Sequence, residues 1–250
     1  MKVRLNKYLT LCGLGSRRKV EDFITSGLIK INGEVVRELG SVIDTETDKV
    51  FFKDSELVAS EKKYYLILNK PEGFVTTLSD EKGRPTVMDL IPEKFKRCGV
   101  IPVGRLDKDT EGLLLFTNDG DLAYRLTRPE FKVPKEYSLI LNAPLAPEHK
   151  KIIEKGYFVH QIKIKTAPAK VELENERGDR VKITIMEGKK RQVRYTFGNL
   201  GYKVLKLRRV GLGPLRLGNI AKGEHRLLKN YEVKALMESA KPVKFREKKY

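Results

Sequence analysis

A polar stretch without periodicity, DSELVASEKK at 54–63, divides this chain of 250 residues into a short and a long part. It has neither the alternation of a strand nor the spacing of an amphipathic helix, which is typical of a linker. We therefore expect two folded domains, 1–60 and 61–240. The last ten residues, 241–250, hold five basic residues and one acidic residue, and we expect a mobile tail that either contacts RNA loosely or only aids solubility.

The first domain has the pattern of two short helices and a hairpin. Apolar residues recur at helical spacing from Leu5 to Cys12, and Ser16 is placed to cap a second helix with Val20 and Ile24 on its apolar face. The run LIKINGEVV that follows contains Asn-Gly, a dipeptide that accepts the positive φ angles of a tight hairpin turn. A small helix and hairpin domain is therefore predicted.

The second domain alternates strand-like and helical segments. Strand-like apolar runs occur at 64–69, 112–117, 136–141 and 181–186, and helical patterns occur around 147–155 and 189–200. We expect Leu205, Leu207 and the leucines between 212 and 217 to close the core. The whole chain is predicted to be α+β, with a mixed, largely antiparallel sheet in the second domain.

The formal net charge of +18 indicates a polyanionic partner. No apolar run approaches the length of a membrane span, and the N-terminus has no secretory signal, so we expect nucleic acid rather than a membrane as partner and a cytoplasmic location. Arg17, Arg18 and Lys19 begin the second predicted helix, where helix dipoles favour anions. They either bind phosphate or form an ordinary solvated face, and we favour phosphate.

Metal and disulfide chemistry are not expected. Cys12 and Cys98 lie far apart in the sequence without a CxxC spacing. The three histidines are isolated from one another and from carboxylate clusters, so we predict no metal site.

Two segments resemble known families. RLNKYLTLCGLGSRRKVEDFITSGLIKINGEVV, from Arg4 to Val36, resembles the S4 RNA-binding domain, which implies docking on structured RNA but reveals no chemistry. GRLDKDTEGLLLFTNDG, from Gly104 to Gly120, places Asp107 among cations directly before a buried strand. Alone this could be a turn or a surface ion pair, but the segment is similar to the signature of bacterial pseudouridine synthases, and the resemblance implies that Asp107 is catalytic.

Two further segments agree with this family in order. The resemblance implies that Tyr137 packs on the target base and that Arg194, in EGKKRQVRYTFGNLGYKVLKLRRVGLGPL, pairs with the catalytic Asp107. A helix there would place Lys190, Arg191 and Arg194 on one face, opposite an apolar face. From the residues alone, an ordinary amphipathic surface helix is equally compatible with this pattern.

The resemblance implies isomerisation of uridine to pseudouridine in ribosomal RNA, with no cofactor because nothing is oxidised. Whether Asp107 attacks the sugar, attacks the base or removes a sugar proton stays open. The expected RNA-binding residues are Arg4, Lys7, Arg17, Arg18, Lys19, Arg105, Lys190 and Arg191.

Through the run DEKGRPTVMDLIP, the family resemblance implies 23S (large-subunit) rRNA as the substrate. We expect the partner to be either this RNA or an immature ribosomal particle, bound by a monomer. The alternatives are a 16S rRNA pseudouridine synthase and a non-catalytic rRNA-binding ribosome-assembly factor. An S4-bearing methyltransferase is disfavoured because no glycine-rich strand-to-helix loop is present.

Overall fold

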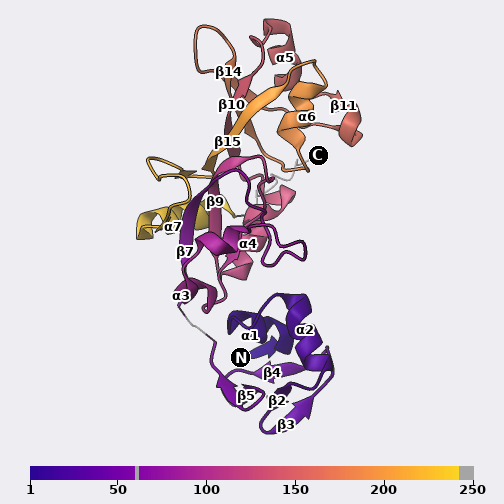
Figure 1. The fold of residues 1–250 in the computed structure, drawn as a ribbon, viewed down its shortest axis with the longest axis vertical. Coiled ribbons are helices and arrows are strands. Elements are labelled where there is room, and N and C mark those ends of the chain that lie inside the picture. Colours follow the sequence, from indigo (N-terminus) through magenta and orange to yellow (C-terminus); the bar gives the residue numbers. More distant parts are fainter. Residues whose placement is uncertain (60–61, 242–250) are drawn as a thin grey trace, which may run out of the picture.

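The computed structural model describes residues 1–59 and 62–241, and Figure 1 shows two bodies, one on each side of the gap. The N-terminal body is built from two helices packed on short strands. Its elements are β1 (Lys2–Arg4), α1 (Leu5–Leu11), α2 (Arg17–Thr25), β2 (Ile29–Ile31), β3 (Glu34–Val36), β4 (Val42–Asp44), β5 (Val50–Phe52) and β6 (Ser55–Leu57).

The predicted helices and hairpin of this body are confirmed. Ser16 caps α2, because its side-chain oxygen accepts a hydrogen bond from the backbone N–H of Lys19 at 3.3 Å. Val20 and Ile24 of α2 are fully buried in one core with apolar residues of α1 and the strands. The turn between β2 and β3 has positive φ angles at Asn32 and Gly33, 52° and 92°, as expected for an Asn-Gly hairpin.

The N-terminal sheet is wider than the predicted hairpin. Its strand order is β3-β2-β5-β6, and β1 pairs with β4 in a separate two-stranded sheet. The linker prediction for 54–63 is therefore wrong over β6, where Leu57 lies opposite Val50 and its carbonyl accepts a hydrogen bond from the Tyr8 hydroxyl at 2.9 Å. The strand was not recognised because Leu57 is its only apolar residue. Residues 60 and 61 of the predicted linker lie outside the described residues.

The second body is a large sheet with helices on both faces, together with a separate two-stranded sheet of β11 and β12 (Figure 1). Its strands are β7 (Tyr65–Lys70), β8 (Ile101–Pro102), β9 (Glu111–Thr117), β10 (Lys135–Leu141), β11 (Phe158–Val159), β12 (Ile164–Lys165), β13 (Lys170–Leu173), β14 (Arg180–Ile185), β15 (Val204–Leu212), β16 (Leu215–Arg216) and β17 (His225–Leu227). Its helices are α3 (Glu93–Lys96), α4 (Gly120–Thr127), α5 (Pro147–Lys155), α6 (Gln192–Gly198) and α7 (Asn230–Ser239), with 3-10 turns η1 (Val87–Leu90), η2 (Pro129–Phe131) and η3 (His160–Ile162).

The main sheet has the order β13-β14-β10-β15-β9-β7-β17 and separates two hydrophobic cores. Leu114 and Phe116 of β9 face the core that includes α3, α5 and α6, whereas Leu113 and Leu115 face the core that includes α4 and α7. Because β9 is buried on both faces, its sequence is a continuous apolar run instead of an alternating one. The predicted α+β fold with a mixed, largely antiparallel sheet is confirmed.

The centre of the sheet is a short parallel contact between β15 and β9, which joins two antiparallel halves. At this contact Gly112 has a φ of 107°, and a Cβ there would lie 2.2 Å from the carbonyl oxygen of Arg209. Any side chain at position 112 would therefore push the strands apart. The functional cavity described below lies over this join.

Three details differ from the sequence predictions. The helix expected over 189–200 is shorter, because Arg191 has a φ of 53° and α6 begins only at Gln192. Lys190 and Arg191 therefore lie in the preceding turn and not on a helical face. The core role predicted for Leu205 is wrong, because its side chain is 51% exposed. The register between β15 and β10 shifts at this point and leaves Leu205 without a partner on β10, so the regular alternation of the strand is interrupted there. Of the predicted tail, 242–250 lies outside the described residues.

Candidate active site

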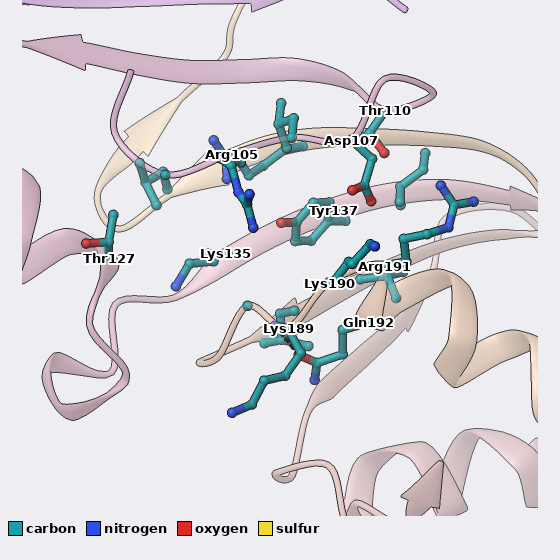
Figure 2. Close-up of a pocket in the computed structure, with 18 of the residues that line it drawn as sticks. Arg105, Asp107, Thr110, Thr127, Lys135, Tyr137, Lys189, Lys190, Arg191 and Gln192 are labelled. Atoms are coloured by element: carbon teal, nitrogen blue, oxygen red, sulfur yellow. Dashed lines mark hydrogen bonds between the residues drawn. The ribbon is translucent and has the colours of Figure 1, made fainter. Parts of the chain in front are cut away.

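A cavity of about 230 Å³ lies over the central join of the sheet (Figure 2). Its walls come from the loop before β9, the end of α4, the turn before α6, and strands β10 and β15. The structure brings Asp107, Tyr137, Arg105, Lys190 and Arg191 together here, whereas Arg194 is not among the lining residues. Segments more than 100 residues apart thus form one pocket.

The loop that carries Asp107 is fixed through its backbone. Each carbonyl from Leu106 to Thr110 accepts a hydrogen bond. The Thr76 hydroxyl donates to the Leu106 carbonyl at 2.8 Å, and the Lys70 ammonium and the Thr110 N–H both donate to the Asp107 carbonyl at 3.1 Å. The Gly73 N–H donates to the Lys108 carbonyl at 2.8 Å, and the Arg194 guanidinium donates to the Asp109 carbonyl at 2.6 Å. The Lys70 ammonium also donates to the Thr110 carbonyl at 2.8 Å. A loop held at five successive carbonyls presents its side chains in one geometry.

Lys70 contributes most to this arrangement, although the sequence analysis assigned it no role. Its side chain is fully buried, and its ammonium donates to the carbonyls of Pro71, Asp107 and Thr110. Burial lowers the pKa of Lys70 to about 8, against the opposing charges of nearby carboxylates such as Asp109. A lysine at the end of a largely apolar strand is the signal in the sequence that could have identified it.

Asp107 itself points to the cavity (Figure 2). Among the described residues, no hydrogen bond or ion pair reaches its carboxylate. The expected pair between Arg194 and Asp107 is not found: Arg194 lies 3.2 Å from the carboxylate of Asp109 and donates to the carbonyls of Asp109 and Val204. The reason is the loop's path, which turns Asp107 to the cavity and Asp109 to α6.

Asp109 ties this loop to the helix that follows. Arg191 donates two hydrogen bonds to the Asp109 carboxylate, at 3.0 and 2.9 Å. Partial burial raises the pKa of Asp109, but the hydrogen bonds from Arg191 and the charge of Arg194 outweigh it and hold the pKa below its usual value. Arg191 and Arg194 therefore orient the loop through Asp109, a residue that the motif analysis did not assign.

Tyr137 forms the centre of the cavity wall and is 8% exposed (Figure 2). Within the described residues, the lining contains six basic side chains and one carboxylate, Asp107; the basic ones are Arg105, Lys135, Lys189, Lys190, Arg191 and Arg209. Lys135, Lys189 and Arg209 were not predicted. Such a cavity favours a ligand with an aromatic face and anionic surroundings, which fits a nucleotide of RNA.

The remaining predicted RNA-binding residues lie on the N-terminal body. Arg17, Arg18 and Lys19 are exposed in the first turn of α2, and Arg4 is exposed at the start of α1. Lys7 is also exposed, with its ammonium 3.9 Å from the carboxylate of Asp121 on α4. The structure thus separates two basic groups, one at the cavity and one on α1 and α2.

The residues that the structure describes contain neither a membrane-spanning helix nor a metal-binding cluster. They contain no helix long and apolar enough to cross a membrane. Across 1–59 and 62–241, no three His, Cys, Asp or Glu side chains gather in a way that could hold a metal ion.

Lys135 gives a testable dependence of stability on pH. Burial, and next the charge of Arg209, lower its pKa from 10.5 to about 8. The folded protein therefore releases this proton at lower pH than the unfolded chain, so the unfolding free energy should rise between about pH 8 and 10.5. Denaturant unfolding of Lys135→Met should show a smaller rise than the wild type. The exposed control Lys206→Met should follow the wild type, and an identical curve for Lys135→Met would contradict the prediction.

Comparison with known proteins identifies both parts of the chain. Residues 64–199 match the RNA pseudouridylate synthase family, and residues 3–49 match the S4 domain family. The match to the synthase family includes the loop of Asp107, Tyr137 and α6.

Relatives of the whole chain agree. An uncharacterised RNA pseudouridine synthase of Aquifex aeolicus is 38% identical, covering 96% of this chain and 95% of that protein. The ribosomal large subunit pseudouridine synthase B of Bacillus subtilis is 37% identical, covering 93% and 95%. A crystal structure of a pseudouridylate synthase superimposes with a TM-score of 0.68 and 32% identity, covering 94% of this chain and 99% of that one. The chain therefore belongs to the RNA pseudouridine synthase family, isomerases that convert uridine to pseudouridine, and carries an S4 RNA-binding domain before the synthase domain.

Proposed function

We propose that this enzyme modifies ribosomal RNA at a specific uridine, and that its substrate is 23S rRNA. The observation that carries this proposal is the 37% identity with the Bacillus subtilis large-subunit enzyme, which extends over 93% of this chain and so includes both domains. Modification of 16S rRNA is the alternative within the same reaction.

In the proposed reaction, the target nucleotide leaves the RNA stack and enters the cavity, where Tyr137 stacks on the uracil. The carboxylate of Asp107 then acts at the ribose or the base while the C1′–N1 bond breaks. Uracil turns and C5 joins C1′; the C5 hydrogen leaves as a proton and N1 gains one, so no redox cofactor is needed. Arg194 keeps the Asp107 loop in place through Asp109, whose carboxylate it meets at 3.2 Å.

The two domains divide the work in this proposal. Residues 1–60 hold structured RNA, and residues 61–240 carry the chemistry, with the tail at 241–250 as a further basic segment. We place the enzyme in the cytoplasm as a monomer, acting on 23S rRNA or on an immature ribosomal particle.

The test is to incubate the protein with unmodified 16S and 23S transcripts and with immature particles, and to map pseudouridine by carbodiimide modification and primer extension. A single new stop on 23S RNA is expected. A stop on 16S RNA alone would move the assignment to the small subunit. Tight, salt-sensitive binding without any stop would support an assembly factor and contradict the proposal.

The contribution of the N-terminal body can be measured by salt dependence. Replacing Arg17, Arg18 and Lys19 by glutamine should weaken RNA binding and reduce the slope of log K against log salt by roughly 2–3, because each phosphate contact contributes about 0.7–0.9. The rate at saturating RNA should not change, since these side chains are far from the cavity.

The matched control replaces Lys151, Lys155 and Lys163 by glutamine. These three lysines are exposed, like the α2 cluster, but they lie on and after α5, at the opposite end of the molecule (Figure 1). The control removes the same charge, so it separates a specific contact from a general electrostatic effect. Equal loss of affinity in both triple variants would contradict a phosphate-binding role for the start of α2.

A further inference from the structure

The cavity wall contains a buried guanidinium that the reaction described above does not use. Arg209 lies on β15 directly opposite Tyr137 of β10, and it is 3% exposed. Its Nε donates to the carbonyl of Leu113 on β9 at 2.7 Å. Its Nη2 is buried, and no hydrogen-bond acceptor for it occurs in the described parts of the chain.

This arrangement costs free energy in the absence of a ligand. A buried charge needs a partner, and an unsatisfied buried N–H loses the hydrogen bonds that water would supply. The neighbouring charge increases the cost, because Lys135 lies close enough for Arg209 to lower its pKa. Two cations at one wall of a cavity imply that an electron-rich group of the ligand arrives there.

The position of Arg209 in the cavity indicates which electron-rich part of a nucleotide approaches it. The exposed cations at the cavity, Arg105 and Lys190, can reach phosphates in water-accessible RNA. Arg209 is instead buried beside Tyr137, the side chain proposed to stack on the base. A group at this depth meets the edge of the uracil ring, whose polar atoms are two carbonyl oxygens and one N–H.

We propose that Arg209 donates a hydrogen bond to a carbonyl oxygen of the target uracil and stabilises the ring while it is detached. When C1′–N1 breaks, the electron pair stays with the ring, and negative charge spreads to O2 and O4. A fixed cation in a water-poor site stabilises this charge more strongly than it stabilises the neutral base. Arg209 remains protonated throughout and transfers no proton. This inference rests on the proposed function.

A cycle of changes in the enzyme and in one atom of the RNA tests the contact. Short RNAs carry the mapped target as uridine, 2-thiouridine or 4-thiouridine, and single-turnover rates are measured for wild type and Arg209→Met. Replacing Arg209 should slow the uridine substrate by roughly 10–100-fold, the range of a hydrogen bond to a charged group. One of the two thio substitutions should lower the rate of the wild-type enzyme. The same substitution should not lower the rate of Arg209→Met any further, because this variant has already lost the hydrogen bond to that atom.

Two controls accompany the cycle. Arg208→Met removes the neighbouring arginine of β15, whose side chain is not among those that line the cavity, and it should leave all three rates near those of the wild type. If Arg209→Met does not fold, Arg209→Lys, which keeps the charge but shortens its reach, replaces it in the same cycle and should show the same coupling.

The outcomes are distinct. Additive effects with both thio substitutions would overturn the proposed contact. Coupling to a phosphorothioate beside the target, and not to O2 or O4, would make Arg209 a phosphate ligand and would also overturn it. If the wild type forms no pseudouridine in any RNA or particle, the proposed function itself has failed. That result is visible before any variant is compared.

Discussion

Asp107→Asn should reduce pseudouridine formation by at least about 10³-fold, roughly 4 kcal/mol in the activation barrier. The asparagine has the same shape, so the loop should keep its five carbonyl hydrogen bonds, none of which involves the Asp107 side chain. Only the negative charge at the cavity is lost. Release of tritium from C5-labelled uridine in RNA measures the rate, because C5 loses its hydrogen when it joins the ribose.

The control for this variant is Asp54→Asn, which removes a carboxylate that is 92% exposed on the N-terminal body. It should retain the wild-type rate. Asp107→Asn should bind RNA about as well as the wild type and unfold within a few degrees of it, since surface changes cost about 0.5 kcal/mol or less. Turnover by Asp107→Asn within tenfold of the wild type would show that the cavity does not use Asp107 as proposed.

The second large effect is expected at Lys70, which contacts no substrate in the proposed reaction. Lys70→Met removes an ammonium that holds the carbonyls of Asp107 and Thr110 at 3.1 and 2.8 Å. Because a displacement of about 1 Å at a catalytic group can cost about 100-fold, the maximal rate should fall by about that factor. RNA affinity should change little, since the exposed basic residues are untouched.

Stability and a matched lysine complete this test. Leaving buried carbonyls unpaired should lower the unfolding free energy by about 1–3 kcal/mol, measured by denaturant unfolding at pH 7. Lys222→Met removes a largely exposed lysine that pairs with Glu111 at the start of β9, close in sequence to the same loop. It should leave the rate within a few-fold of the wild type. A folded Lys70→Met enzyme with normal turnover would show that the loop holds its geometry without Lys70.

Local sequence was sufficient where the decisive interactions are local. The cap at Ser16, the Asn32-Gly33 turn and the apolar run of β9 each depend on neighbouring residues, and each was predicted. Strand β6 was missed because two of its three residues are polar and because it is stabilised by pairing with β5. Helix α6 was predicted too long because the turn at Arg191 is set by its contact with Asp109, 82 residues earlier.

The sequence by itself determined the fold class, the basic character of the surface and the two motifs that contain Asp107 and Tyr137. The tertiary structure decided which carboxylate forms an ion pair with Arg194, and which backbone carbonyls accept hydrogen bonds from Lys70 and Arg209. The physical reason is that a motif fixes the order of residues, whereas the direction of each side chain depends on hydrogen bonds between distant segments. In this chain the carbonyl from Leu113 that holds Arg209 lies 96 residues away, and no local pattern contains that information.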